Sequence, residues 1–216
     1  MLEAVASHDL WIWHAFFGMA GANNDLNVLD NSNLFDTILA GESPRAPYTV
    51  NGRRYEQGYY LADGIYPRWA TFVKSFSATT DEKHSYFKRK QESARKDIER
   101  AFGVLQGRWG ILQHPARAWE IVKIQRVMYT CIILHNMILK DQNFILREYK
   151  KMWVDPAPNL SQDRWIDRCE TQRRKTREMR DAGVHGQLQR DLMEHVWQKR
   201  LQYQQEHEEE YSEDDE

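Results

Sequence analysis

The chain has 216 residues, of which 41% are hydrophobic and 12% aromatic, so a folded core is expected and global disorder is excluded. The formal charge of −2 is unevenly distributed, because residues 206–216 hold eight acids and no Lys or Arg. The first 205 residues hold 30 Lys and Arg against 24 Asp and Glu, a formal charge of +6. The charge of the whole chain therefore does not exclude a polyanionic partner.

Cysteine content and hydropathy indicate where in the cell the protein is expected. The two cysteines, Cys131 and Cys169, have neither the spacing of a zinc site nor that of a disulfide framework. We therefore expect a reducing compartment, nuclear or cytoplasmic. No run of about 18 apolar residues occurs, so we expect no membrane span, and no secretory signal is evident.

The N-terminal segment predicts an antiparallel hairpin. Apolar and polar residues alternate over 2–7, a turn is expected at residues 8–9, and an aromatic-rich strand follows over 11–19. After a loop of small and polar residues, Asn24 or Asp25 is expected to cap a helix that runs to about Leu39.

A second hairpin and a buried strand follow. The Asn51-Gly52 dipeptide predicts a tight turn between strands at 48–50 and 53–56. Residues 59–62 form an apolar run that ends at Asp63 and Gly64, which predicts a buried strand with a carboxylate at its end. Pro67 suits the first turn of a helix, so a short helix is expected over 67–72.

Residues 82–112 have the spacing of one long helix. Its apolar stripe, at steps of three and four, consists of Ala94, Ile98, Phe102, Leu105 and Trp109. Glu99 lies one residue, about 100°, from that stripe. We therefore expect Glu99 at the flank of the packed face, where it can reach toward the edge of a sheet.

The rest of the chain predicts two further helices around a charged linker. Residues 119–140 have a strong apolar face that includes His135, for which a hydrogen-bonded core histidine is favoured over a catalytic role. The predicted organisation is a core over 1–112, a closing helix within 113–145, a charged linker over 146–182, an amphipathic C-terminal helix over 183–205 and an acidic disordered tail over 206–216.

Asp63 and Glu99 form the candidate catalytic pair. An acid at a strand end and an acid on a helix can converge on Mg²⁺ or Mn²⁺, because these ions prefer carboxylate oxygens. Such ions can clamp the attacking and leaving oxygens of a phosphodiester. Spacing by itself favours a simpler interpretation, in which Asp63 is a turn residue and Glu99 a surface acid paired with Arg95.

Resemblance to a known family adds weight to the catalytic interpretation. Residues 60–67 (YLADGIYP) and 94–106 (ARKDIERAFGVLQ) resemble the segments that hold the second Asp and the Glu of the DDE motif in PIF/Harbinger-type transposases. Further segments that resemble the plant branch of this family, in the family's order, are Leu2–Ser7, Trp11–Gly18, Asn23–Leu29, Cys131–Ile138 and Leu188–Trp197.

The resemblance implies an α/β fold of RNase H-like (DDE transposase/integrase) type and a divalent-metal cofactor held by Asp63 and Glu99. In that family a central first strand carries the first Asp, and it would precede Leu2. We therefore expect an incomplete RNase H-like core with a weakened metal site and an open sheet edge. Asp9 and Asp25 are the nearest substitutes in sequence for the absent ligand, although neither is favoured.

The helix that bears Glu99 is also basic. Residues 83–108 hold eight Lys or Arg and three acids, and Arg95, Lys96 and Arg100 flank the candidate acid. These three residues are candidates for binding DNA phosphates, which would give affinity without sequence choice. A solvated helix face is an equal alternative. No helix-turn-helix, zinc finger or homeodomain pattern occurs in the sequence. In the family that the chain resembles, an N-terminal DNA-binding segment or a separate Myb-like partner supplies recognition, so the resemblance implies one of these two sources.

Two functions stay open at this stage. The first is a metal-dependent DNA endonuclease or strand transferase of transposase descent. The second is a domesticated remnant without catalysis that binds DNA or protein in the nucleus. The absent first Asp favours the second hypothesis physically, so enzymatic activity is uncertain from the sequence. The sequence specifies no target site and no oligomeric state.

Overall fold

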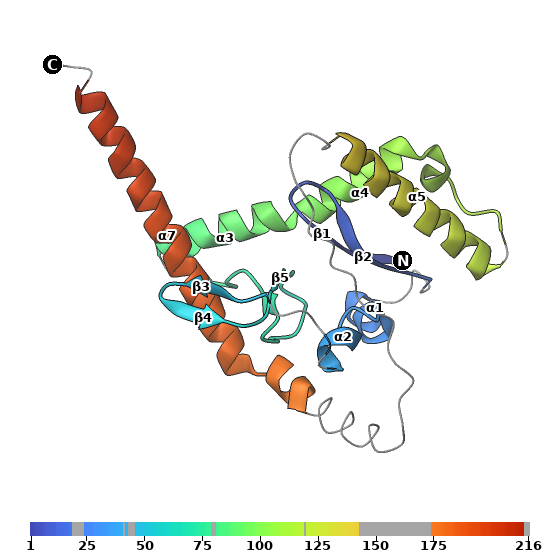
Figure 1. Ribbon diagram of the computed structural model, residues 1–216, viewed down its shortest axis with the longest axis horizontal. Helices are drawn as coiled ribbons and strands as arrows, with labels where there is room; N and C mark the ends of the chain where they lie inside the picture. The colour runs from blue at the N-terminus through green and yellow to red at the C-terminus, as the bar shows by residue number, and fades with distance from the viewer. Residues whose placement is uncertain are drawn as a thin grey trace. The chain divides into compact units, whose positions relative to one another are not determined.

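The computed structural model describes residues 1–18, 24–40, 42, 46–78, 81–118, 120–142 and 174–213, with side chains to residue 206. Over these residues the chain is mixed α/β, and its strands pair into two-stranded sheets (Figure 1). The chain divides into two compact units, Met1–Asp36 with Lys96–Glu170 and Thr37–Arg95 with Thr171–Glu216. The predicted α/β class is confirmed, while the RNase H-like topology and the predicted division into domains stay predictions.

The first unit is built on the predicted N-terminal hairpin. Strands β1 (Leu2–Ala6) and β2 (Ile12–Phe17) pair antiparallel, with a register irregularity between Val5 and Ala6. Helix α1 (Asp25–Asn31) starts at an Asn24 cap, whose side chain accepts the backbone N–H of Asn27, as predicted.

The predicted single helix to Leu39 is wrong, because the backbone is extended at Ser32, and α2 (Asp36–Leu39) is a separate short helix. Asn31, Ser32 and Asn33 favour this break, since their side chains compete for backbone hydrogen bonds.

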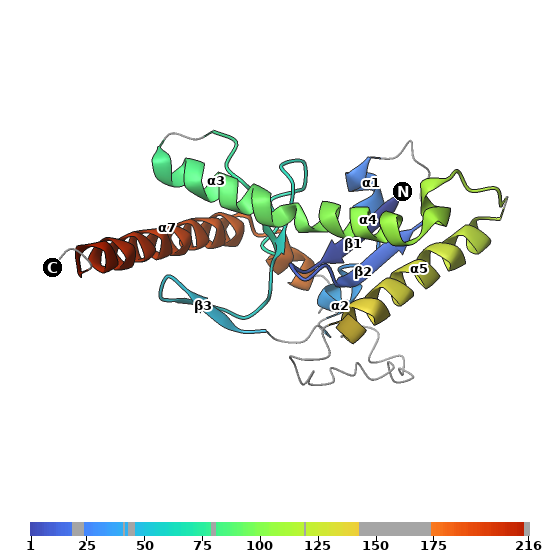
Figure 2. The ribbon, with the colours of Figure 1, turned by 90° about the horizontal axis from the view of Figure 1, so that it is seen from above.

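Two helices and a 3₁₀ turn cover the hairpin. Helix α4 (Asp97–Arg108) packs on β1 and α5 (Ile121–Gln142) packs on β2, with η1 (Gly110–Gln113) between them in sequence (Figure 2). The core of this unit consists of Ile12, Ala101, Leu105, Cys131 and Ile132. The buried residues of α4 are Asp97, Ala101 and Leu105, so the predicted stripe through Ala94 and Phe102 is shifted by one position along most of its length.

Helix α5 is fixed to the hairpin by two adjacent polar side chains. His135 is completely buried, and its Nε2–H donates to the carbonyl of Leu10 at 2.9 Å while Nδ1 accepts from Arg108 at 3.2 Å. Asn136 accepts the backbone N–H of Ile12 at 3.0 Å and donates to the Ile12 carbonyl at 2.8 Å. His135 is therefore the hydrogen-bonded core histidine that the sequence favoured. Leu10, which it holds, has a φ of 68° in the hairpin turn.

Burial lowers the pKa of His135, and the charge of Arg108 acts in the same direction, against the hydrogen bond to Leu10. The imidazole is therefore neutral at physiological pH, which matches its role as one donor and one acceptor.

Replacing Asn136 by Ala is expected to destabilise the first unit by about 2 kcal/mol, because both backbone groups of Ile12 lose their partner. Asn136→Asp keeps the acceptor for the N–H but loses the donor, so a substantial part of the loss is expected to remain. Chemical denaturation measures both effects, and Lys140→Ala on the exposed side of α5 is the control. Equal stability of Asn136→Ala and Lys140→Ala would refute the role of Asn136.

The second unit contains two small sheets. Strands β3 (Tyr48–Val50) and β4 (Arg53–Tyr55) form the predicted hairpin, and Asn51 (φ 50°) and Gly52 (φ 73°) provide the tight turn. Strands β5 (Tyr60–Leu61) and β6 (Phe72–Val73) pair in parallel.

The predicted helix over 67–72 is wrong. The chain instead returns to β5, where the N–H of Tyr60 donates to Thr71 and the N–H of Ala62 donates to Val73. Phe72 and Val73 are buried, so tertiary burial outweighs the local preference of Pro67 for a helix start.

The long helix predicted over 82–112 is also wrong as one element. Helix α3 (Glu82–Arg95) ends before Lys96, which is in a turn, and α4 begins at Asp97. Phe87 of α3 belongs to the core of the second unit, whereas Ala101 of α4 belongs to that of the first. The break therefore coincides with the change from one core to the other.

Helix α7 (Ala182–Glu213) completes the second unit by packing on α3 and the β3–β4 hairpin. The core of this unit consists of Val50, Val73, Phe87, Leu188, Leu192 and Met193. The helix extends past residue 205, where the predicted amphipathic segment ended, and residues 146–173 of the predicted linker lie outside the described residues. Over the described part of the chain, no helix combines the length and the apolar character needed to cross a membrane.

A buried carboxylate ties α7 to the hairpin. Asp191 accepts hydrogen bonds from Tyr55 (2.5 Å), Asn51 (3.2 Å) and Gln187 (3.1 Å), and Arg53 lies 3.3 Å away. Burial by itself would raise the pKa of Asp191, but these hydrogen bonds and the charge of Arg53 together lower it.

Asp191→Asn is expected to destabilise the second unit by about 3 kcal/mol at neutral pH, since it removes a buried, hydrogen-bonded charge. The lowered pKa means that the wild-type carboxylate stabilises the fold above its ordinary pKa and that this contribution is lost as pH falls through the lowered value. The difference in the free energy of unfolding between the wild type and Asp191→Asn should therefore decrease on acidification. Denaturation curves at neutral and acidic pH measure it, and a difference that grows on acidification would contradict the assignment.

Candidate metal and phosphate site

Asp63 lies at the end of the parallel strand pair. It follows Ala62, whose N–H donates to the carbonyl of Val73, and its side chain is 56% exposed. Its Oδ1 accepts the backbone N–H of Gly64 at 2.6 Å. The predicted carboxylate after a strand is confirmed, but the strand is not buried as predicted, because Tyr60 is half-buried and Leu61 is exposed. The Gly64 contact shows that Asp63 also orders the turn that follows it.

A buried glutamine on α3 forms hydrogen bonds to the backbone at this strand end. Gln91 is 4% exposed, and its amide nitrogen donates to the carbonyls of Ala62 (3.1 Å) and Val73 (3.0 Å). One side chain therefore joins the ends of both strands to α3. Because Ala62 immediately precedes Asp63, Gln91 fixes the backbone from which the candidate carboxylate projects.

Cations surround Asp63 on the same unit. Nη1 of Arg95, one turn after Gln91 on α3, lies 3.9 Å from Oδ2 of Asp63. Lys74 donates to the carbonyl of Tyr66 at 2.5 Å and is close enough to interact electrostatically with Asp63. Burial lowers the pKa of Lys74 and the charge of Arg68 lowers it further, while Asp63 opposes the shift. Asp63 therefore lies beside two basic residues, which balance part of its negative charge.

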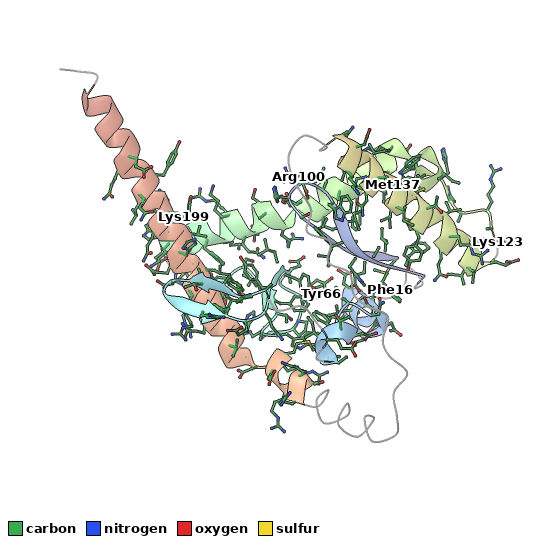
Figure 3. The ribbon with its side chains drawn as sticks, in the orientation of Figure 1. Phe16, Tyr66, Arg100, Lys123, Met137 and Lys199 are labelled. Carbon is green, nitrogen blue, oxygen red and sulfur yellow. The ribbon has the colours of Figure 1, made fainter. Side chains whose placement is uncertain are left out.

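The other candidate residues lie on or beside α4. Glu99 is exposed in the first turn of the helix, where the positive end of the helix dipole favours a carboxylate. Lys96 is exposed in the turn before the helix, and Arg100 forms an ion pair with the buried Asp97 (Arg100 is labelled in Figure 3). The structure places Arg95 beside Asp63, and the simpler alternative, in which Glu99 is a surface acid paired with Arg95, stays a prediction.

The structure brings Asp63 together with Arg95, Gln91 and Lys74. Asp63 belongs to the second unit and Glu99 to the first, so their convergence on one metal ion stays a prediction. Asp9, considered as a substitute ligand, accepts hydrogen bonds from Ser7 and from the N–H of Trp11 within the hairpin turn. Among the described side chains, no group of three His, Cys, Asp or Glu gathers into a metal site.

A separate polar cluster in the first unit has a structural role. Ser32 donates to Oε1 of Glu3 at 3.0 Å, and Nε2 of His14 lies 3.2 Å from the same hydroxyl. Burial raises the pKa of Glu3, and burial lowers that of His14. In a nucleophilic triad the acid holds the histidine, and the histidine holds the serine. Here the carboxylate of Glu3 accepts from Ser32 directly, so the order of the groups differs. The cluster instead ties α1 to the hairpin.

Comparison with known proteins establishes the family. The family model described as plant transposon protein matches residues 1–145, about two thirds of the chain. This chain belongs to that family. The matched region contains both Asp63 and Glu99, whereas α7 lies outside it.

A curated relative supports this assignment. "Protein ALP1-like" from Arabidopsis thaliana is 24% identical over 140 residues, which cover 64% of this chain and 34% of that protein. The match thus spans about a third of the length of the relative. No solved structure matches the chain.

The sequence missed Gln91 and Lys74 as members of the site. Gln91 is four residues before Arg95, so the sequence places both on one face of a helix. Nothing in the sequence shows that this face of the helix packs against the end of a strand. Lys74 follows β6, a strand that the sequence did not predict. Both were missed because their role depends on the pairing of β5 with β6.

Gln91→Ala is expected to destabilise the second unit by about 2–3 kcal/mol, since two buried carbonyls lose their donor. Gln91→Glu is the matched variant, because its carboxylate has the same shape but no N–H. We expect Gln91→Glu to be as destabilising at neutral pH and to recover partly in acid, where its carboxyl regains one donor. Hydrogen exchange at the amides of Tyr60 and Ala62 follows the strand pair directly, and unchanged protection in both variants would refute the role.

Proposed function

We propose that this member of the plant transposon family is a DDE-type, RNase H-like phosphodiester-handling protein of transposase descent, in which Asp63 and Glu99 hold a divalent metal ion. The observation that carries the proposal is the position of Asp63. It is an exposed carboxylate at the end of a parallel strand pair, on a backbone fixed by Gln91, inside a segment that resembles the second-Asp region of Harbinger transposases.

The donor set fits a hard cation. Both residues offer carboxylate oxygens, which Mg²⁺ and Mn²⁺ prefer, and both are exposed. A bound ion would polarise a phosphodiester and favour attack by water or a 3′-hydroxyl. The turn at Gly64 holds Oδ1 of Asp63, so Oδ2 is the oxygen directed to other partners, and Arg95 is the partner that the structure shows for it.

The cations of the site supply affinity for the substrate. Arg95 and Lys74 are the basic residues next to Asp63, so they would hold a phosphate of the DNA backbone beside the carboxylate. Arg100 was a candidate for the same role, but its ion pair with Asp97 leaves it less available. Lys96 is exposed in its turn and stays a candidate phosphate contact.

One observation favours a second candidate function, a nuclear DNA- or protein-interaction module without catalysis. Arg95 lies 3.9 Å from Asp63, so part of the negative charge that would attract a metal ion is already balanced by a guanidinium. Under this candidate function, Asp63 orders the turn at Gly64 and pairs with Arg95. The protein would then bind DNA or a Myb-like partner without cleaving DNA.

Titration of the purified chain with Mn²⁺, followed by nicking of supercoiled DNA, separates the two functions. The nuclease predicts saturable metal binding and cleavage that both Asp63→Asn and Glu99→Gln reduce by at least about a hundredfold, because each removes an anionic ligand. Glu120→Gln, an exposed acid before α5, removes the same charge elsewhere and should leave cleavage unchanged.

Arg95→Gln tests the competition between arginine and metal. If Asp63 is a ligand, this variant should bind Mn²⁺ more tightly and DNA more weakly than the wild type. Absence of metal binding at millimolar Mn²⁺ in both wild type and Arg95→Gln would eliminate the nuclease and leave the interaction module.

A further inference from the structure

An aromatic pair on α3 and α7 organises a group of cations away from Asp63. Tyr86 of α3 and Trp197 of α7 meet edge to face, with ring centroids 6.0 Å apart at 75°. The guanidinium of Arg200 lies 4.7 Å from the Tyr86 centroid and 4.9 Å from the Trp197 centroid. The two helices contact each other in the second unit, where they cross at an angle (Figure 1). The rings therefore hold one cation between two helices.

Two further cationic side chains lie near the ring of Tyr86. The guanidinium carbon of Arg89 is 6.0 Å from the Tyr86 centroid, and Nζ of Lys90 is 5.5 Å from it. Arg89 and Lys90 are three and four residues after Tyr86, so they occupy the same side of α3. Both are exposed. We call Tyr86, Arg89, Lys90, Trp197 and Arg200 the basic–aromatic patch.

The charges at this patch are unequally balanced. Glu82 pairs with Arg200 at 2.7 Å, and Glu194 pairs with Lys83. Arg89 and Lys90, in contrast, have no carboxylate partner among the described residues, and their contacts are with the ring of Tyr86. The patch thus presents two adjacent cations that the ring partly orients, which lowers the entropy lost when they bind an anion.

We propose that the basic–aromatic patch is a second contact surface for the phosphate backbone of duplex DNA, with Arg89 and Lys90 as the contacting residues. Adjacent cations without carboxylate partners fit successive phosphates, and such contacts give affinity without sequence choice. Cations lie against the aromatic rings, so the rings position charge and do not stack on bases. This feature favours a duplex over a single strand, whose binding uses exposed aromatic faces.

The patch is independent of the metal site, because it contains neither Asp63 nor Glu99. Membership of the plant transposon family makes DNA the polyanion to test first. A binding assay in EDTA removes the contribution of the proposed metal ion, and the loss of affinity in a variant of Arg89 and Lys90 then separates the patch from the phosphate contacts proposed for Arg95 and Lys74. The proposed metal chemistry can therefore fail while this surface binds, and the reverse.

The experiment measures binding of the full chain to a short duplex by fluorescence anisotropy, in EDTA and at several salt concentrations. Arg89→Ala/Lys90→Ala should weaken binding by about tenfold or more and reduce the slope of log affinity against log salt by about 2, one per lost phosphate contact. Two duplexes of unrelated sequence should show the same loss. Tyr86→Phe keeps the ring and should bind as the wild type does.

The matched control is Arg126→Ala/Lys140→Ala, which removes the same charge from exposed positions on α5. It should change affinity by less than about twofold. Both variant pairs are on helix surfaces, and circular dichroism verifies that each retains the wild-type fold. An equal loss in the two pairs, no loss in Arg89→Ala/Lys90→Ala, or tighter binding of single-stranded DNA or an acidic polypeptide than of the duplex would overturn the proposal.

Discussion

Backbone groups at the ends and edges of two-stranded sheets need hydrogen-bond partners, and in this protein helix side chains provide them. Asn136 of α5 satisfies both backbone groups of Ile12 in the first hairpin. Gln91 of α3 bridges the ends of β5 and β6. A small sheet cannot satisfy these groups alone, and each buried group left unpaired would cost about 1–3 kcal/mol. The arrangement of helices around the strands therefore depends on a few amide side chains.

The same constraint determines the candidate site. Gln91 fixes the strand end, the strand end positions Asp63, and α3 carries Arg95 to the carboxylate one turn later. The carboxylate of Asp63 can consequently interact with either of two kinds of cation. A guanidinium neighbour stabilises its charge in the absence of metal, whereas a divalent ion would compete with that guanidinium for the same oxygen. Under the functions proposed above, the balance between these cations would decide between a catalytic protein and an interaction module.

Local signals in the sequence were sufficient where short-range chemistry decides the structure. Asn51-Gly52 predicted its turn because both positions need positive φ, and Asn24 predicted the cap of α1 because its side chain accepts a nearby N–H. The helix expected from Pro67 and the unbroken helix over 82–112 were wrong. In the first case burial of Phe72 and Val73 beside β5 prevailed, and in the second α3 and α4 contribute to different cores.

The sequence by itself determined the family, the strand before Asp63 and the helical conformation at Glu99, though not the bounds of that helix, because motif order and hydrophobic period are properties of the chain. Only the tertiary structure decided which side chains surround Asp63 and which cations share Tyr86. Gln91 and Lys74 become neighbours of Asp63 through the parallel pairing of β5 with β6, and Arg200 reaches Tyr86 through the packing of α7 on α3. Contacts between residues that are distant along the chain depend on how the elements pack, and periodicity carries no information about them.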